Sequence, residues 1–180
     1  MEILNIEIKA RTKQPAKIRN ILKTKNAKYK GLDHQIDTYF KVHNGRLKLR
    51  EGAIENHLIY YARENQKGPK RSEVMLFKTR PGSTLKELLV AANGILTIID
   101  KKREIYFIDN VKFHLDAVKG LGSFVEIEAI DKDGSIGEKK LLQQCEHYLK
   151  LFGISESELV ATSYSDLKLQ KETKPNEGAH

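Results

Sequence analysis

The chain lacks the features that mark exported and membrane-spanning proteins. Its 180 residues include one cysteine, Cys145, which excludes an internal disulfide framework and which we expect in a helix core. No apolar run reaches the roughly 18–20 residues that a membrane-spanning helix requires. Residues 1–4 carry neither the basic nor the apolar stretch of a secretory signal. These absences predict a cytoplasmic protein that does not enter a membrane.

Several nucleotide- and metal-binding motifs are also missing. The absence of a Gly-x-x-x-x-Gly-Lys-Ser/Thr loop excludes a P-loop nucleotidase. The Gly-Leu-Gly segment at 120–122 is too short for a dinucleotide-binding fingerprint and indicates a hairpin turn. The six histidines show no zinc-ligand spacing. His114 shares a strand face with Asp116 and could line a site, but a structural histidine is the favoured interpretation.

Positive charge is abundant. The net charge of +8 favours polyanionic partners: a nucleotide, a polyphosphate, a nucleic acid or an acidic membrane surface. A solvated basic exterior would give the same excess, so net charge alone does not choose among these partners.

Hydrophobic periodicity and turn residues predict a sheet-rich chain with a few helices. Asn44-Gly45, between two alternating segments, is the strongest hairpin signal. Strands are expected at 3–11, 35–43, 46–51, 57–64, 73–79, 95–108, 111–118 and 123–130, and helices near 15–26, 84–93, 136–152 and from Ser155. Strands linked by successive hairpins favour an α+β fold, a closed antiparallel β-barrel of about eight strands with helices packed outside.

The domain organisation is simple. Residues 1–170 show no internal repeat and no linker, so we expect one domain. Residues 66–72 form a basic segment that predicts a loop. Residues 171–180 are a polar tail that we expect to be disordered.

Ionic side chains recur at alternate positions of several expected strands. Residues i and i+2 of a strand point the same way, so each row shares one face of its strand. The rows contain Glu7, Lys9, Arg46, Lys48, Arg50, Arg63, Lys101, Arg103, Asp116, Glu126 and Glu128. For any single strand, such a row is explained by the solvent-exposed face of an ordinary sheet. Repetition over five or six strands favours a shared lumen, because sheet exteriors usually mix charge with Thr, Ser and Gln.

The chemistry of these rows suits a metal-bound polyphosphate. Arginine can grip phosphate oxygens in a bidentate way, and lysine acts as a movable point charge. Glu126 and Glu128, with Glu7 from another strand, offer hard oxygen ligands for Mg²⁺ or Mn²⁺. Such an ion would offset the charge that develops on a leaving group.

The same residues resemble the CYTH superfamily, the triphosphate tunnel enzymes that include class IV adenylate cyclases and thiamine triphosphatases. The family hallmark Glu-x-Glu-x-Lys is similar to Asn5-Ile6-Glu7-Ile8-Lys9. The resemblance spans about 3–168, and its most specific part is 101–128. Its other segments are 37–40, 47–51, 58–63, 68–72 and 163–167.

The resemblance implies an eight-stranded barrel whose lumen binds a nucleoside or organic triphosphate with a divalent metal. By motif position, the residues expected to bind phosphates are Lys9, Lys48, Arg50, Arg63, Lys101 and Arg103. The expected metal ligands are Glu7, Glu126 and Glu128, and the expected catalytic residues are Asp116, Lys101 and Arg103. Asp116 resembles the acidic residue near the reacting centre. Lys70 and Ser72, in a basic loop at the tunnel mouth, could close over the substrate or simply be solvated.

One position departs from the hallmark. Asn5 supplies a neutral oxygen where the family has a carboxylate. A second metal would therefore bind more weakly there, which puts two-metal catalysis in doubt more than triphosphate binding.

Three functions remain open from sequence. The favoured one is a class IV-like adenylate cyclase, in which the ribose 3′-hydroxyl of ATP attacks the α-phosphorus and expels pyrophosphate. The second is a triphosphatase acting on thiamine triphosphate, tripolyphosphate or another small triphosphate. The third is a non-catalytic polyphosphate or nucleic-acid binder; nucleic acid is disfavoured because the aromatics lie in strands where they can simply pack. The sequence also allows a homodimer.

Overall fold

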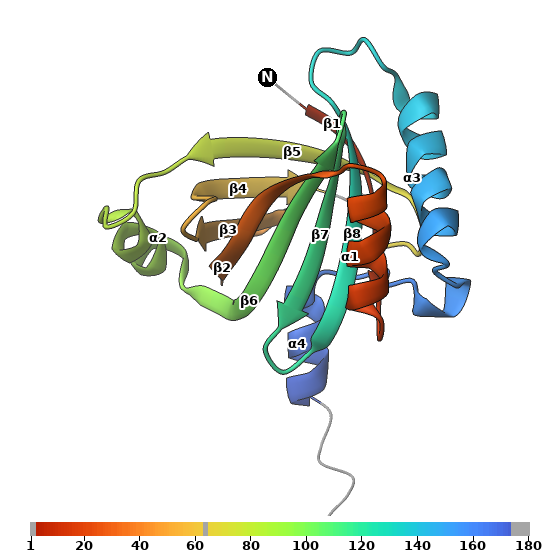
Figure 1. Ribbon diagram of the computed structural model, residues 1–180. Coiled ribbons are helices and arrows are strands. Elements are labelled where there is room, and N and C mark those ends of the chain that lie inside the picture. The colour runs from red at the N-terminus through yellow and green to blue at the C-terminus, as the bar shows by residue number, and fades with distance from the viewer. Residues whose placement is uncertain (1–2, 63–64, 174–180) are drawn as a thin grey trace, which may run out of the picture.

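The computed structural model describes residues 3–62 and 65–173. Eight strands close into an antiparallel barrel with the order β1-β5-β4-β3-β2-β6-β7-β8 (Figure 1). The strands are β1 (Ile3–Arg11), β2 (Lys28–Phe40), β3 (Arg46–Glu51), β4 (His57–Ala62), β5 (Lys70–Lys78), β6 (Ile95–Ile108), β7 (Val111–Val118) and β8 (Gly122–Asp131). The helices are α1 (Pro15–Thr24), α2 (Leu85–Asn93), α3 (Glu138–Phe152) and α4 (Tyr164–Thr173), with a 3-10 turn at Glu156–Glu158. The predicted barrel is confirmed.

Helices cover the outside of the barrel along β1, β7 and β8. In Figure 1, α1 and α3 lie against this side of the wall. Ile6 and Ile8 of β1 point outward into a core that includes Phe113, Leu141 and Cys145. Each such apolar side chain contributes about 1.5–3 kcal/mol when fully buried. Because the apolar alternates are buried outside, the polar alternates of the same strands face the interior.

A second apolar cluster fills one end of the barrel interior. Tyr39, Tyr61 and Phe124 meet Tyr164, the first residue of α4. The Phe124 and Tyr164 rings pack edge to face, with their centroids 4.9 Å apart. Tyr164 is 4% exposed. The lumen is therefore closed by aromatic side chains at the end that α4 covers.

Several elements differ from the prediction, and three of these differences have a local reason. β2 begins at Lys28 rather than 35, because a register shift at Gly31, where φ is +144°, breaks the alternation. β5 begins at Lys70, so the predicted loop 66–72 is wrong from that residue on. Helix α4 was not predicted, because it buries only Tyr164 and Ser165 and so shows little apolar periodicity.

Parts of two predictions lie beyond the described residues. Residues 171–173, assigned to the tail, are the last residues of α4, and 174–180 fall outside the described ranges. Residues 63–64, the predicted end of the fourth strand, also fall outside them. Within the described ranges, no helix is both long and apolar enough to cross a bilayer.

Candidate active site

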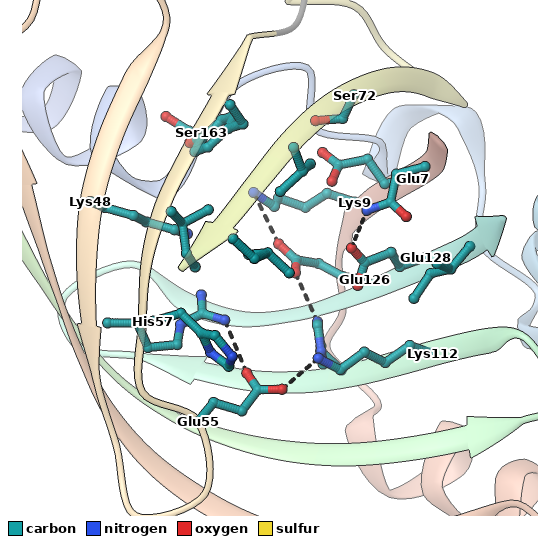
Figure 2. Close-up of a pocket in the computed structure, with 18 of the residues that line it drawn as sticks. Glu7, Lys9, Lys48, Glu55, His57, Ser72, Lys112, Glu126, Glu128 and Ser163 are labelled. Atoms are coloured by element: carbon teal, nitrogen blue, oxygen red, sulfur yellow. Dashed lines mark hydrogen bonds and ion pairs between the residues drawn. The ribbon is translucent and has the colours of Figure 1, made fainter. Parts of the chain in front are cut away.

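The barrel encloses a cavity of about 240 Å³. Side chains from all eight strands line it together with residues at the start of α4, and Figure 2 shows many of them pointing toward one another. The charged and histidine side chains among them are Glu7, Lys9, Lys48, Arg50, Glu55, His57, Arg103, Lys112, His114, Glu126, Glu128 and Lys132. The ionic rows of separate strands thus meet in one interior space, as the lumen hypothesis predicted.

Most predicted site residues lie in this cavity. The predicted phosphate-binding residues there are Lys9, Lys48, Arg50 and Arg103, and the predicted metal ligands there are Glu7, Glu126 and Glu128. Ser72 also lines it, from β5 rather than from a loop.

Two of the predicted catalytic residues are buried and do not line the cavity. Lys101 is 1% exposed, and its Nζ lies 2.6 Å from Asp37 Oδ2. Asp116 accepts hydrogen bonds from Arg103 and, at 2.7 Å, from the Tyr164 hydroxyl. Neither is among the residues that line the cavity. Their catalytic role stays a prediction, and the geometry gives both of them a positioning role through neighbouring side chains.

Three other cations of the sequence prediction are placed differently. Lys70 is buried in β5, and its Nζ donates to the carbonyls of Val160 and Ala161 at 3.3 and 2.9 Å. Its predicted position in a mouth loop is therefore wrong. Arg46 reaches Asp166 at 2.7 Å and does not line the cavity. Arg63 lies outside the described residues.

Asp37 organises the cationic side of the site. Arg50 donates Nε and Nη2 to its two oxygens, both at 2.9 Å, while Lys101 and Lys48 approach Oδ2 to 2.6 and 3.2 Å. Burial alone would raise the pKa of Asp37, but the three cations hold it well below its ordinary value. Asp37 therefore stays ionised and holds the Arg50 side chain in place. The two residues are direct partners in the register of β2 and β3, which sets the position of the guanidinium group.

Arg103 and Lys9 are held by Glu126. Arg103 Nη2 lies 2.9 Å from Glu126 Oε2, and Lys9 Nζ lies 3.1 Å from Oε1. The Lys9 ammonium also stands 3.9 Å from the centroid of the Tyr164 ring. Burial lowers the pKa of Lys9, and Glu126 opposes that shift. A phosphate arriving here would give these two cations a stronger anionic partner.

The wall formed by β1 and β8 is acidic. Glu7 and Glu128 are direct partners in the β1–β8 register, and both line the cavity. Asn5 donates its Nδ2 to Glu128 Oε1 at 2.5 Å, and its own Oδ1 is buried without a hydrogen-bond partner. Like charges directly opposite on neighbouring strands repel unless a cation or proton lies between them. Hard carboxylate and amide oxygens are the donor set that Mg²⁺ or Mn²⁺ takes.

The acidic wall is not a complete metal cage. In the described ranges, no group of three His, Cys, Asp or Glu side chains could hold a metal ion by itself. The donor chemistry at Glu7 and Glu128 suits a hard cation, and phosphate oxygens or water would complete its coordination.

The arrangement corresponds to a known family. Residues 4–164 match the model of the CYTH domain. The chain belongs to the CYTH family. A "Putative adenylate cyclase" of Methanocaldococcus jannaschii is 26% identical over 176 residues, which cover 92% of this chain and 99% of that protein.

Solved structures share the CYTH fold at lower identity. A conserved hypothetical protein of Pyrococcus furiosus superposes with a TM-score of 0.75 at 24% identity, covering 91% of this chain and 99% of its own. A structure from Hippeastrum, described as a "putative adenylyl cyclase" with a dominant triphosphatase activity, has a TM-score of 0.60 at 15% identity and covers 98% of both chains.

Several cavity residues of this CYTH protein were missed or set aside by sequence reasoning, among them Glu55, His57, Lys112 and His114. Lys112 and His114 share a β7 face with Asp116, so the alternation that selected Asp116 could have found both. Glu55 lies in a loop and His57 at the first position of β4, where periodicity gives no signal. His114 Nδ1 lies 3.1 Å from Glu126 Oε2. His114 therefore lines the cavity, which the sequence analysis left open beside a structural role.

Proposed function

We propose that this protein is a metal-dependent enzyme that acts on a triphosphate bound in the barrel cavity, with adenylate cyclase as the leading activity. One observation carries the proposal. Four cations from β1, β3 and β6 face an acidic pair on β1 and β8 within one cavity of the barrel. This separation of charge suits a polyphosphate bound on one side and a divalent cation on the other.

The cations would bind and orient the phosphates. Arg50 and Arg103 are held rigidly by Asp37 and Asp116, so they would present N–H donors without rearrangement. Lys9 and Lys48 have single ammonium groups that can follow the phosphate oxygens. Asp37 and Asp116 act as positioning residues in this scheme.

Glu7 and Glu128 would hold Mg²⁺ or Mn²⁺, with Asn5 beside them. When bound, the ion supplies neutralisation of charge on the phosphate oxygens. Glu126 stays a predicted ligand of the metal. Its oxygens accept from Lys9, Arg103 and His114, so it would have to release one of these partners to bind a cation.

Two reactions fit the same cavity. In a cyclase, the ribose 3′-hydroxyl attacks the α-phosphorus and pyrophosphate leaves. In a triphosphatase, water attacks the terminal phosphorus. The name of the Methanocaldococcus jannaschii relative favours the first, and the activity described for the Hippeastrum protein favours the second.

Product analysis separates the possibilities. The protein is incubated with ATP, tripolyphosphate or thiamine triphosphate in Mg²⁺ or Mn²⁺, and the products are resolved by chromatography. Cyclic AMP with pyrophosphate supports the cyclase, and inorganic phosphate supports the triphosphatase. Tight binding without turnover would make the protein a polyphosphate binder.

A matched pair of variants tests the site. Glu126→Ala should abolish turnover because Lys9 and Arg103 lose their shared partner in the cavity. Glu104→Gln is the control, because Glu104 pairs with Arg19 away from the cavity. Normal turnover and metal dependence in Glu126→Ala would overturn the assignment of Glu126.

A further inference from the structure

The loop between β3 and β4 is folded against the barrel wall at a fixed position. Asp33 of β2, which is fully buried, accepts the backbone N–H groups of Ala53, Ile54 and Glu55 at 2.7, 3.0 and 3.0 Å. The loop lies so close to Asp33 that a Cβ on Gly52 would stand 2.6 Å from Asp33 Oδ2. The position of Glu55 is therefore set by the backbone of its own loop.

Glu55 joins cations from two walls that are not neighbours. Its Oε1 lies 2.5 Å from Lys112 Nζ of β7, and its Oε2 lies 3.1 Å from Arg50 Nη1 of β3 (Figure 2). Two strands, β2 and β6, separate β3 from β7 in the barrel order. Gln35 adds a further donor to Oε2 at 3.1 Å. Both oxygens of this 6% exposed carboxylate are thus occupied by cavity cations.

The contact between Glu55 and Arg50 occupies an N–H donor that a phosphate oxygen could otherwise accept from. Arg50 gives Nε and Nη2 to Asp37, and its Nη1 goes to Glu55. Lys112, the other partner, lines the same cavity. A phosphoryl group placed between Arg50 Nη1 and Lys112 would have to displace Glu55.

We propose that Glu55 is a built-in anion that fills one phosphate subsite of the cavity, between Arg50 and Lys112, and so limits the length of polyphosphate that the protein accepts. This inference rests on the proposed function. Glu55 makes the cavity select three linked phosphates against four, because a fourth phosphoryl group would meet a fixed carboxylate instead of two free cations.

The Glu55→Gln variant removes the charge and keeps the size of the side chain. The glutamine amide can still accept a hydrogen bond from Lys112 or Arg50 through its single oxygen. Its NH₂ group can donate to a phosphate oxygen, whereas the carboxylate of Glu55 repels one. A charged hydrogen-bond partner of this kind changes affinity by about tenfold or more. We therefore expect tetrapolyphosphate to gain about tenfold in affinity relative to tripolyphosphate.

Titration calorimetry with tripolyphosphate and tetrapolyphosphate, in the presence of Mn²⁺, tests the inference on the full chain. The wild type should prefer tripolyphosphate, and Glu55→Gln should shift the ratio of the two dissociation constants toward tetrapolyphosphate. Adding Lys112→Gln to this variant should cancel the shift, because the freed subsite loses its second cation. Glu104→Gln, which removes a carboxylate charge outside the cavity, should leave the ratio unchanged.

Each outcome has a distinct meaning. An unchanged ratio in Glu55→Gln, in protein that unfolds at the same temperature as the wild type, would overturn the subsite and leave the proposed function standing. If Glu55→Gln does not fold, Glu55→Ala is measured in its place and must show the same shift. A wild type that binds neither polyphosphate would overturn the proposed function itself.

Discussion

The two sides of the cavity balance charge in opposite ways. On the side of β2, β3 and β6, the carboxylate of Asp37 meets three cations, Arg50, Lys101 and Lys48. On the side of β1 and β8, Glu7 stands opposite Glu128, and the neutral Asn5 is the donor to Glu128. The first side is rich in cations and suits an anion, and the second is rich in carboxylates and suits a cation. A metal-bound polyphosphate satisfies both sides at once.

Removing the carboxylate from the cationic side should have the largest effect. Asp37→Asn leaves buried cations without their anion, which should lower the free energy of unfolding by about 3–5 kcal/mol at pH 7. Urea denaturation followed by circular dichroism measures this loss. A stability equal to that of the wild type would show that the cations repack around water.

The effect of Asp37 should also depend on pH. Its pKa is depressed in the folded state, so its stabilising contribution is present above the unfolded pKa of about 3.9 and is lost as the pH falls below that value. The stability difference between Asp37→Asn and wild type should therefore shrink below about pH 4. A constant difference between pH 7 and pH 3 would contradict this linkage.

A subtler change on the same side exchanges one cation for another. Arg103 makes two bonds to Asp116 and one to Glu126, a geometry that lysine cannot reproduce. Arg103→Lys should lower kcat/KM about 10- to 100-fold with little change in fold. Steady-state kinetics on the substrate found by product analysis measures the loss. Wild-type kinetics would mean that charge alone, and not the planar fork, matters at this position.

The acidic side can be weakened in the same way. Glu128→Gln removes one of the two facing carboxylates, and the affinity for Mn²⁺ should fall on the order of 10- to 100-fold. Titration calorimetry with Mn²⁺ alone gives this value independently of turnover. Glu138→Gln, which removes an exposed carboxylate of α3, is the control. Equal Mn²⁺ affinity in wild type and Glu128→Gln would place the metal elsewhere.

Restoring the hallmark residue should strengthen the acidic side. Asn5→Glu places a third carboxylate beside Glu7 and Glu128, so we expect a severalfold gain in Mn²⁺ affinity and a second bound ion at high Mn²⁺. Without metal, the added like charge should lower the thermal unfolding temperature. A gain in stability without metal would contradict this reading of the wall.

An ion pair outside the cavity should show the smallest effect. Arg19 makes two bonds to Glu104, the same fork geometry that Arg103 makes with Asp116. Because Arg19 is one-third exposed, Arg19→Lys should change stability by less than about 1 kcal/mol and leave turnover unchanged. Thermal unfolding and the product assay measure both. A loss comparable to that of Arg103→Lys would show that burial does not decide the role of these arginines.

The cavity could be predicted from the sequence, because the alternation of apolar and ionic residues can be recognised within each strand separately. Ile6 and Ile8 alternate with Glu7 and Lys9, and the apolar set is buried outside by helices while the ionic set lines the lumen. The same alternation correctly predicted that Arg103 and the carboxylates of β8 face the lumen.

Depth along the barrel could not be predicted, because it depends on contacts between distant segments. Lys101 and Asp116 share strand faces with Arg103 and His114 but are buried outside the cavity lining, where Lys101 pairs with Asp37 and Asp116 accepts from Tyr164. Lys70 was assigned to a loop because Gly68-Pro69 precedes it, although its ammonium is held by carbonyls of the segment before α4. Glu55 was not predicted as a site residue, because it lies in a loop where Asp33 fixes its position and no alternating pattern marks it.

Tyr164 has a consequence for how the chain is made. It follows all eight strands in the sequence, yet its ring packs on Phe124 and its hydroxyl binds Asp116 inside the barrel. While the ribosome is still synthesising this protein, the strands emerge first and their interior remains open to water at that end. The interior becomes dry there only when the last helix leaves the exit tunnel, so nascent chains arrested before residue 164 should be protease-sensitive and unable to retain a polyphosphate.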